Sequence, residues 1–550
     1  MSASYQPLPT DDRTNRSRTS LSPRKRPKAS FLVFLAVSLF LVGVPTYNAF
    51  HRLAADRDQA LIGKIPEIQN TTVAVNQTEM SQQGKYSVGY FVNWGIYGRK
   101  FPPSLIPAED LTHILYAFAN VKSETGEVFL SDLWADQDIH YPGDSWDDTS
   151  NNLYGNFNAI YKLKQQHRHL KVILSIGGWT YSPSFHPVVV DASRRARFVE
   201  SAVQLLEDYA LDGLDVDYEY PQNDEQARGY VALLHELRHA LDQHARNKGI
   251  DYRFLLTIAA PCGPDNYKKL HAAEMDRALD FWNMMSYDFS GSWDQIANHQ
   301  ANVFGGLISA AEAINWYIAQ GVPRHKIIMG IPLYGRSFMN TRGPGHPFSG
   351  VGAGSWEQGV YDYRALPLPN SQVFHDERAL ASWSFDPAKG EMVSFDTAQV
   401  GWWKGEYIAR EGLGGSMFWE LSGDKGSPRE GMEKGEGKDE VPGDSLVRTV
   451  KQAMGGLDHS PNWLRYERSK FKNIANGGTG GGANPTPPIT TATDRDGSQP
   501  RPSIAPWSPS AVYTGGMTCT HAGYVWTAKW WTQGETPGPN VDVWAQGAAV

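Results

Sequence analysis

Three acidic residues alternate along one short stretch of the chain and could carry acid–base chemistry. Residues 212–219 read Asp-Gly-Leu-Asp-Val-Asp-Tyr-Glu, so single residues separate Asp215, Asp217 and Glu219. On a β-strand, alternate side chains point to the same face, about 6–7 Å apart. Carboxylates this close in a low-dielectric interior cannot all ionise, so at least one pKa should rise. A raised carboxyl pKa suits a general acid at neutral pH.

A solvated acidic face and a metal site are the alternative interpretations of this stretch. A solvated face would need helical spacing or an edge strand, and Leu214 and Val216 fit neither. A metal site would need histidines or further carboxylates nearby, and none is evident in the sequence. No metal and no cofactor is therefore implied.

The acidic stretch belongs to a series of β-rich runs that alternate with helical stretches. Eight strands with intervening helices predict an α/β fold, a parallel (β/α)8 TIM barrel, with a doubly wound open sheet as the alternative. In the barrel the acidic face points inward, and Glu219 lies at the carboxyl end of its strand, where barrel chemistry takes place. The predicted strands are 86–91, 113–119, 171–176, 213–218, 253–259, 281–287, 326–331 and 415–419.

Further segments flank or interrupt the predicted barrel, which covers 85–475. The stretch between its last two strands is too long for one helix, and short aromatic runs predict an inserted small α+β subdomain at about 338–400. Residues 476–503 have the Gly, Pro and Thr composition of a flexible linker. Five of the 18 tryptophans follow within 504–550, a segment too short for a large core.

The N-terminal region predicts export. A polar, basic tail (1–30) precedes an apolar segment (31–50) whose strongest part is shorter than the roughly 20 residues of a full span. The positive flank predicts a cytoplasmic N-terminus. Cleavage after Ala49 would place Tyr47 at the −3 position, which favours an uncleaved type II signal anchor over a cleaved signal peptide or a buried core helix.

Residues 51–84 are predicted to form a polar stem outside the cell. Asn70 and Asn76 begin N-glycosylation sequons and are candidate acceptors. The protein is therefore expected to be extracellular or at the cell surface, either anchored in the membrane or secreted.

Composition excludes several classes of protein. A chain of 550 residues with 41% hydrophobic residues can bury a sizeable core, which excludes global disorder. Two cysteines cannot staple a disulfide scaffold, and Cys262 and Cys519 are expected to be free thiols. A net charge of −8 argues against nucleic acid as a partner. The many tryptophans suit flat stacking surfaces, of which sugar rings would be one partner.

The pattern Asp-Gly-x-Asp-x-Asp-x-Glu at 212–219 resembles the signature of glycoside hydrolase family 18, the chitinases, in the class that carries an α+β insertion. The resemblance covers about 85 to 475, and its motifs follow in order along the chain. Further matches lie at 89–94, 116–118, 175–179, 285–288, 332–338 and 417–420.

This resemblance implies hydrolysis of β-1,4 linkages in chitin and chitooligosaccharides, with retention, through an oxazolinium intermediate formed by the substrate's own N-acetyl group. Glu219 would protonate the glycosidic oxygen and later activate water. Asp217 would orient the acetamido group, Asp215 would tune the protonation of Asp217, and Tyr287 would donate a hydrogen bond to the acetamido oxygen.

The resemblance also implies the substrate-binding residues, with Trp419 as the floor of the −1 subsite. Ordinary barrel packing is the alternative for each aromatic side chain. The implied set is Tyr90, Trp94, Phe118, Ser175, Gly178, Trp179, Met285, Asp288, Tyr334, Arg336 and Trp419.

The last segment resembles the chitin-binding modules of carbohydrate-binding families 5 and 12, which are small and all-β. The match covers about 504 to 547 and includes Ala-Lys-Trp-Trp at 528–531. The resemblance implies a flat chitin-binding face that draws on Trp507, Trp530 and Trp531, with a mini-core without ligand as the alternative.

Two other functions remain open. A non-catalytic chitin-binding lectin could share the fold, although such lectins typically lose the last acidic residue, which is present here as Glu219. An endo-β-N-acetylglucosaminidase acting on N-glycans shares the acidic motif, but the insertion and the chitin-binding module argue against it. The sequence predicts no oligomeric state.

Overall fold

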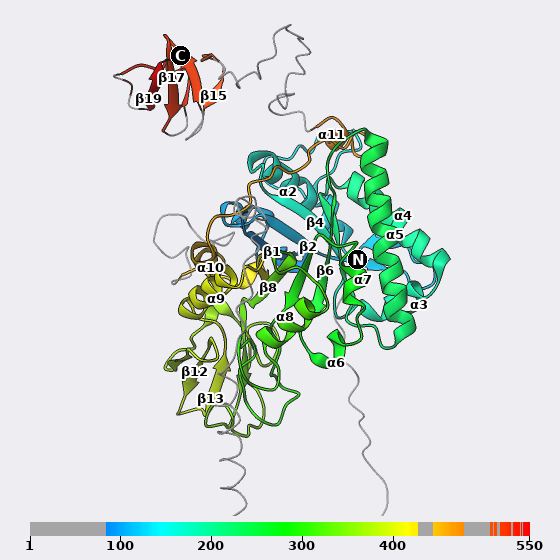
Figure 1. Ribbon diagram of the computed structural model, residues 1–550, viewed down its shortest axis with the longest axis vertical. Coiled ribbons are helices and arrows are strands. Elements are labelled where there is room, and N and C mark those ends of the chain that lie inside the picture. The colour runs from blue at the N-terminus through cyan, green and yellow to red at the C-terminus, as the bar shows by residue number, and fades with distance from the viewer. Residues whose placement is uncertain are drawn as a thin grey trace, which may run out of the picture. The chain divides into compact units, whose positions relative to one another are not determined.

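The computed structural model describes residues 84–426, 444–477 and most of 506–549 (Figure 1). Within the last stretch, residues 510, 514–517, 530, 531, 540 and 542 are not described. The chain divides into two units, Met1–Gln83 and Gly84–Val550. The predicted tail, anchor and stem, with Asn70 and Asn76, lie outside the described residues. Among those that are described, no helix has the length and apolar character needed to cross a membrane.

Eight parallel strands close into a barrel, which confirms the predicted TIM-barrel fold. Their order is β1-β14-β8-β7-β6-β5-β4-β2, and β1 also pairs with β2. The short antiparallel strand β3 (Val128–Leu130) pairs with the carboxyl end of β2, beyond the residues that pair with β1. The barrel strands are β1 (Tyr86–Val92), β2 (His113–Val121), β4 (Lys171–Gly177), β5 (Gly213–Asp217), β6 (Leu255–Pro261), β7 (Phe281–Met285), β8 (Ile327–Pro332) and β14 (Gly415–Trp419).

Helices surround the barrel and cover the outward faces of its strands (Figure 1). Several begin at polar residues whose side chains accept backbone N–H bonds, such as Asp191 before α4 and Asn223 before α5. The helices are α2 (Gly155–Gln166), α3 (Phe185–Val189), α4 (Ala192–Asp208), α5 (Asp224–Lys248), α6 (Pro264–Tyr267), α7 (Ala272–Met275), α8 (Ala310–Ala319), α9 (Ala398–Arg410), α10 (Leu446–Met454) and α11 (Lys472–Ala475).

Alternation along β5 separates its two faces. Leu214 and Val216 are fully buried in the large cluster between the strands and the helices. Asp215 pairs in register with Ser175 of β4 and Thr257 of β6, so its side chain lies inside the barrel. A separate apolar cluster fills the rest of the barrel interior and includes Val88, Leu115, Ile173, Phe281, Ile328 and Met417.

An antiparallel five-stranded sheet is inserted between β8 and α9. Its strand order is β10-β9-β13-β12-β11, and its first strand already begins at Tyr334. Phe338 and Met392 form its small core with Ala297. The strands are β9 (Tyr334–Phe338), β10 (Val360–Asp362), β11 (Gln372–Asp376), β12 (Ala381–Asp386) and β13 (Glu391–Ser394).

The C-terminal segment forms a small all-β module, as predicted. Its two sheets pair β15 with β18, and β16 and β19 with β17. Trp526 and Trp544 are buried in its core together with Tyr513 and Cys519. Cys262 and Cys519 are both free, which confirms the prediction of two thiols. The strands are β15 (Val512–Tyr513), β16 (Thr518–His521), β17 (Tyr524–Ala528), β18 (Thr532–Gln533) and β19 (Trp544–Ala549).

A buried ion pair anchors the start of β5. The ammonium of Lys164 on α2 lies 2.7 Å from Asp212 Oδ2, and both side chains are at most 1% exposed. Asp212 also accepts hydrogen bonds from the backbone N–H of Val172 and Trp463. The first acidic residue of the 212–219 stretch therefore has a structural role, because it ties β5 to a helix, to β4 and to the C-terminal part of the barrel.

Replacing Lys164 by Met should destabilise the barrel by about 3 kcal/mol, because it leaves the Asp212 charge buried without a cation. Lys162→Met is the matched control, since Lys162 pairs with Asp144 at 2.6 Å but is 49% exposed, and it should cost less than about 1 kcal/mol. Urea unfolding followed by circular dichroism measures both. Equal stability of the two variants would contradict a supporting role for the buried pair.

Candidate active site

Asp215 is fully buried inside the barrel and is held by neutral donors from four strands. Its carboxylate accepts hydrogen bonds from Thr257 Oγ1 at 2.6 Å, Ser175 Oγ at 2.7 Å, Asn283 Nδ2 at 3.3 Å and Tyr90 OH at 3.4 Å. Burial raises the pKa of Asp215, and these hydrogen bonds oppose the rise. The structure thus brings the predicted residues Tyr90 and Ser175 together beneath the acidic strand.

Asp217 is buried directly beyond Asp215, and its Oδ1 atom has no hydrogen-bond partner among the described residues. Burial raises its pKa well above the ordinary value, and the charges of Glu219 and Asp215 raise it further. An unpaired buried carboxyl oxygen is costly, so it needs either a proton or a donor from a ligand. Asp217 is therefore suited to hold an N–H group that enters the site.

Glu219 lies just past the carboxyl end of β5 and is only partly buried. Its backbone N–H donates to Ser182 Oγ at 2.7 Å, and Tyr220 OH donates to its Oε2 at 3.1 Å. Burial, followed by the charge of Asp288, raises the pKa of Glu219 to about 7, against the effect of the Tyr220 hydrogen bond. A carboxyl group with this pKa can both give and take a proton near neutral pH.

Tyr287 follows β7, which lies two strands from β5 in the barrel, and it is near enough to the acidic group for the charges of Asp217 and Glu219 to act on it. Burial raises its pKa well above the ordinary value, and the Asp217 charge adds to the rise, so the phenol is a neutral donor. Its OH lies 3.8 Å from the sulfur of Met417. Gly330 of β8 makes room for the ring, because a Cβ there would lie 2.9 Å from Tyr287 Cε1. Met285 packs in the same interior cluster.

Asp288 joins the barrel to the inserted sheet. Its Oδ1 accepts hydrogen bonds at 2.5 Å from Tyr334 OH and from Arg336 Nε, both on β9. The Arg336 guanidinium lies 4.7 Å from the centre of the Trp293 ring. The predicted residues 288, 334 and 336 thus form one cluster at the edge of the acidic site.

Several aromatic rings contact one another beside the acidic strand. Trp419 stacks on Phe118 with centroids 5.7 Å apart and meets Tyr90 edge-on at 4.9 Å. Phe118 is also 6.2 Å from Trp94, which is 42% exposed. Gly178 permits this arrangement, since a Cβ there would lie 2.7 Å from Phe118 Cε2. The rings therefore connect the barrel interior to the surface.

Two predicted aromatic positions lie apart from this group. Trp179 is 73% exposed and makes no ring contact with another described residue. In the C-terminal module, Trp507 packs against the core, meets His521 edge-on at 5.4 Å and is only partly buried. Trp530 and Trp531 lie outside the described residues.

Several residues of the site were not identified from the sequence. Thr257 and Asn283 bind Asp215 from the neighbouring strands β6 and β7, and Ser182 and Tyr220 bind Glu219. The two-residue period of β6 and β7 is the signal that could have identified Thr257 and Asn283 as inward-facing polar residues.

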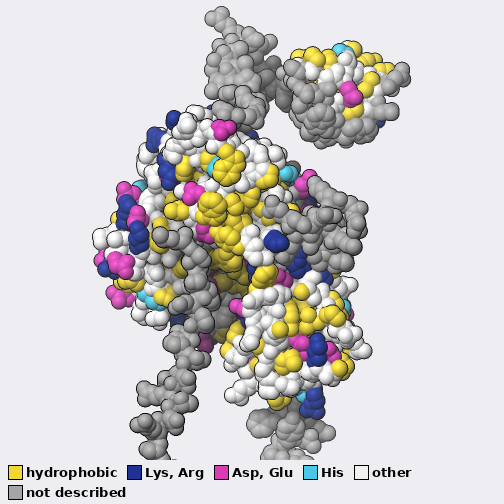
Figure 2. Space-filling view, turned by 180° about the vertical axis from the view of Figure 1, so that it is seen from behind, with side chains coloured by type: hydrophobic (Ala, Val, Ile, Leu, Met, Phe, Trp, Pro, Cys, Tyr) yellow, Lys and Arg dark blue, Asp and Glu magenta, His cyan; other side chains and the backbone are white. Residues whose placement is uncertain are grey.

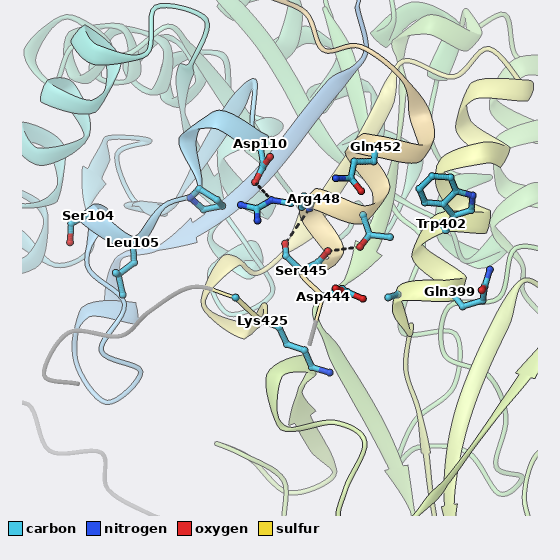
Figure 3. A pocket seen from close by; sticks show the side chains of 14 residues that line it. Ser104, Leu105, Asp110, Gln399, Trp402, Lys425, Asp444, Ser445, Arg448 and Gln452 are labelled. Atoms are coloured by element: carbon cyan, nitrogen blue, oxygen red, sulfur yellow. Dashed lines mark hydrogen bonds and ion pairs between the residues drawn. The ribbon is translucent and has the colours of Figure 1, made fainter. Parts of the chain in front are cut away.

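The molecular surface offers both a hollowed apolar band and a polar cavity. Figure 2 shows hydrophobic side chains gathered in a hollowed band across one face. A cavity of about 690 Å³ lies between α9, α10 and the turn Pro103–Leu105 (Figure 3). Arg448 and Trp402 line it, and Arg448 binds Asp110. None of the predicted site residues lines this cavity.

The described part of the chain holds no group of three or more His, Cys, Asp or Glu side chains that could bind a metal ion.

Two family models match the chain. The model described as glycosyl hydrolases family 18 matches residues 86–424, and that of carbohydrate-binding module family 5/12 matches residues 506–545. The first covers the barrel, the acidic strand and the inserted sheet, and the second covers the C-terminal module.

Proteins similar to this chain include named chitinases. Endochitinase 1 of Metarhizium robertsii is 44% identical over 71% of this chain and 91% of its own length. Chitinase 1 of Aphanocladium album is 44% identical over 70% of this chain and 90% of its own length. Among solved structures, chitinase ChiA74 from Bacillus thuringiensis aligns with a TM-score of 0.61 at 29% identity, over 68% of this chain and 70% of that chain.

Replacing Tyr220 by Phe should raise the pKa of Glu219 above about 7, because the lost hydrogen bond favours the charged carboxylate. Infrared difference spectra recorded against Glu219→Gln isolate the carboxyl band and follow its titration. Tyr361→Phe is the control, since Tyr361 OH also donates to a carboxylate at 3.1 Å, that of Glu391 in the inserted sheet. An unchanged or lower pKa in the Tyr220 variant would show that this hydrogen bond does not act on Glu219.

Proposed function

This chain belongs to the family 18 glycosyl hydrolases and is a chitinase, and we propose that it cleaves chitin with retention of configuration. The bonds cut are the β-1,4 linkages between N-acetylglucosamine units, in the polymer and in chitooligosaccharides. The pair formed by Glu219 and Asp217 carries this proposal. Glu219 has a pKa of about 7, and Asp217 has a buried oxygen without a hydrogen-bond donor among the described residues.

In the first step, Glu219 donates its proton to the glycosidic oxygen while the bond between that oxygen and C1 breaks. The acetamido oxygen of the same sugar forms a bond to C1, which gives an oxazolinium intermediate and releases the other chain end as an alcohol. In the second step, water attacks C1 while the bond between C1 and the acetamido oxygen breaks, which restores the acetamido group, and the water gives its proton to Glu219. Two displacements at C1 retain its configuration.

Asp217 and Tyr287 hold the acetamido group in this mechanism. The acetamido N–H supplies the missing donor to Asp217, and the neutral Tyr287 phenol donates to the acetamido oxygen before it attacks. Asp215 acts through Asp217, because its own charge adds to the raised pKa of Asp217. The fixed placement of the acetamido oxygen near C1 reduces the entropic part of the barrier.

The aromatic residues and the C-terminal module supply two binding surfaces. Trp419 is the floor for the sugar at the cleavage site, and Phe118 and Trp94 continue the surface outward. The module binds chitin independently, through a face that draws on Trp507, Trp530 and Trp531. A flexible linker at 476–503 then raises the local concentration of the barrel at an insoluble surface. The protein works outside the cell, either secreted or held by its N-terminal segment.

The full acidic set argues against the lectin alternative. A lectin needs a sugar-binding floor such as Trp419, but it has no use for a carboxyl group with a pKa of about 7 at the end of β5. The match to a chitin-binding family at 506–545 favours a chitin substrate over the N-glycan alternative.

Glu219→Gln should lower turnover about a thousandfold or more, because the amide keeps the shape but cannot donate the proton. Release of soluble oligosaccharides from colloidal chitin measures turnover, and tryptophan fluorescence should show that oligosaccharide binding is kept. Glu236→Gln, on the outer helix α5, is the control and should remain active. Wild-type protein should leave cellulose oligomers uncut because they lack the N-acetyl group. Near-normal turnover by Glu219→Gln would refute the assigned role.

A chain that ends at residue 477 should adsorb about tenfold more weakly to insoluble chitin, because it lacks the second binding surface. Its rate on soluble chitooligosaccharides should stay within about twofold of the full chain, since the barrel is intact. Depletion from solution by chitin powder measures adsorption. Equal adsorption of the two chains would rule out chitin binding by the module.

A further inference from the structure

Arg99 joins three segments that are far apart in the chain. It follows the turn Asn93–Ile96, and its Nη1 atom lies 3.1 Å from Asp362 Oδ1 and 3.1 Å from Glu420 Oε1. Asp362 ends β10 of the inserted sheet, and Glu420 directly follows Trp419. The Arg99 side chain is 19% exposed and both carboxylates are 9% exposed. One cation thus compensates two nearly buried charges, which makes its position strongly constrained.

The same ion pair holds an exposed indole ring in place. Trp356 Nε1 donates to Asp362 Oδ2 at 2.8 Å, and the Arg99 guanidinium carbon lies 5.0 Å from the centre of the ring. Gly98 lies close to the ring, since a Cβ there would be 3.2 Å from Trp356 Cζ3. Trp356 nevertheless remains 51% exposed. A ring fixed by several contacts yet open to solvent can stack on a ligand at little further cost in conformational entropy.

The segment that carries Arg99 also carries two other exposed rings. Trp94 is 42% exposed and Tyr97 is 46% exposed. Trp94 contacts Phe118, which stacks on Trp419. Aromatic surface therefore leads from the floor of the site along the segment after β1 toward Trp356. Arg99 reaches both ends of this surface, through Glu420 at the floor and through Asp362 at the insertion.

We propose that Arg99 is a positioning residue that holds Trp419 and Trp356 in one fixed arrangement, so that a long chitin chain contacts both rings. This rests on the proposed chitinase function and deepens it. Trp356 stacks on a sugar unit remote from the bond that is cut. The fixed spacing lets the binding of that unit hold the chain over Trp419. Arg99 and Trp356 thereby set the preference for long chains over short ones.

The test compares the hexamer of N-acetylglucosamine with an aryl glycoside of its dimer. Trp356→Ala should raise KM for the hexamer about tenfold and leave kcat/KM for the dimer glycoside unchanged. Arg99→Ala should raise the hexamer KM at least as much and should also lower kcat on the dimer glycoside, because Trp419 loses its anchor. Arg99→Lys should restore the dimer rate but not the hexamer KM, since lysine keeps the charge without the flat stack on Trp356.

Arg195→Ala is the matched control. Arg195 is 14% exposed, and its guanidinium pairs with Glu236 at 3.0 Å and donates to the Val189 carbonyl, so its loss reports on stability alone. If Arg99→Ala changes the kinetics only as Arg195→Ala does, Arg99 is not a positioning residue. If Trp356→Ala affects both substrates equally or neither, the long chain does not use that ring. Failure of the wild-type protein to cut either substrate would instead overturn the proposed function.

Discussion

The site depends on enclosing three carboxyl groups, two on β5 and that of Glu219 just past its end, with no cation among the described residues in direct contact with Asp215. The four described side chains that donate to Asp215 are neutral, and they come from β1, β4, β6 and β7. Burial raises the pKa of Asp215, Asp217 and Glu219 alike. The donors must reach one level of the barrel together, and a shift of one residue in any strand would turn its donor outward. The register of the closed barrel is therefore part of the chemistry.

Close approach of backbones is the second constraint around β5. Gly177 has a φ of +120°, and a Cβ there would lie 2.1 Å from the carbonyl oxygen of Asp217. Gly178 donates its N–H to that same oxygen at 2.9 Å and leaves room for Phe118. Two adjacent glycines at the end of β4 thus place the acidic strand and the aromatic surface in contact. The Gly-Gly-Trp sequence at 177–179 is explained by this packing as much as by any contact with sugar.

Short β-rich runs between helical stretches were enough to predict the barrel strands, and side-chain alternation was enough to predict the inward face of the acidic stretch. Leu214 and Val216 are apolar because they face the helices, and that pattern is local to β5. The partners of Asp215 were not predictable in the same way, because strand register joins residues that are far apart in the chain. The start of the inserted sheet at Tyr334 was not predictable for the same reason, because β9 is defined by its pairing with β10 and β13. Arg99 carried no pattern at all, and only the fold brings it to Asp362 and Glu420.

The charge of the site gives a reason why the proposed mechanism would need an acetamido group on the substrate. A neutral polymer brings no counter-ion, so the protein must balance its own carboxyl groups. At Glu219 the Tyr220 hydroxyl stabilises the charged form, and the proton can leave near pH 7. No described donor forms a hydrogen bond to Asp217 Oδ1, so burial favours the protonated form of the Asp217 carboxyl group. An acetamido N–H would supply the missing donor, and recognition of the N-acetyl group would then also stabilise the negative charge that faces the oxazolinium ion. A glucose polymer offers neither this N–H nor the acetamido oxygen, so Asp217 would stay unpaired and no oxazolinium ion could form.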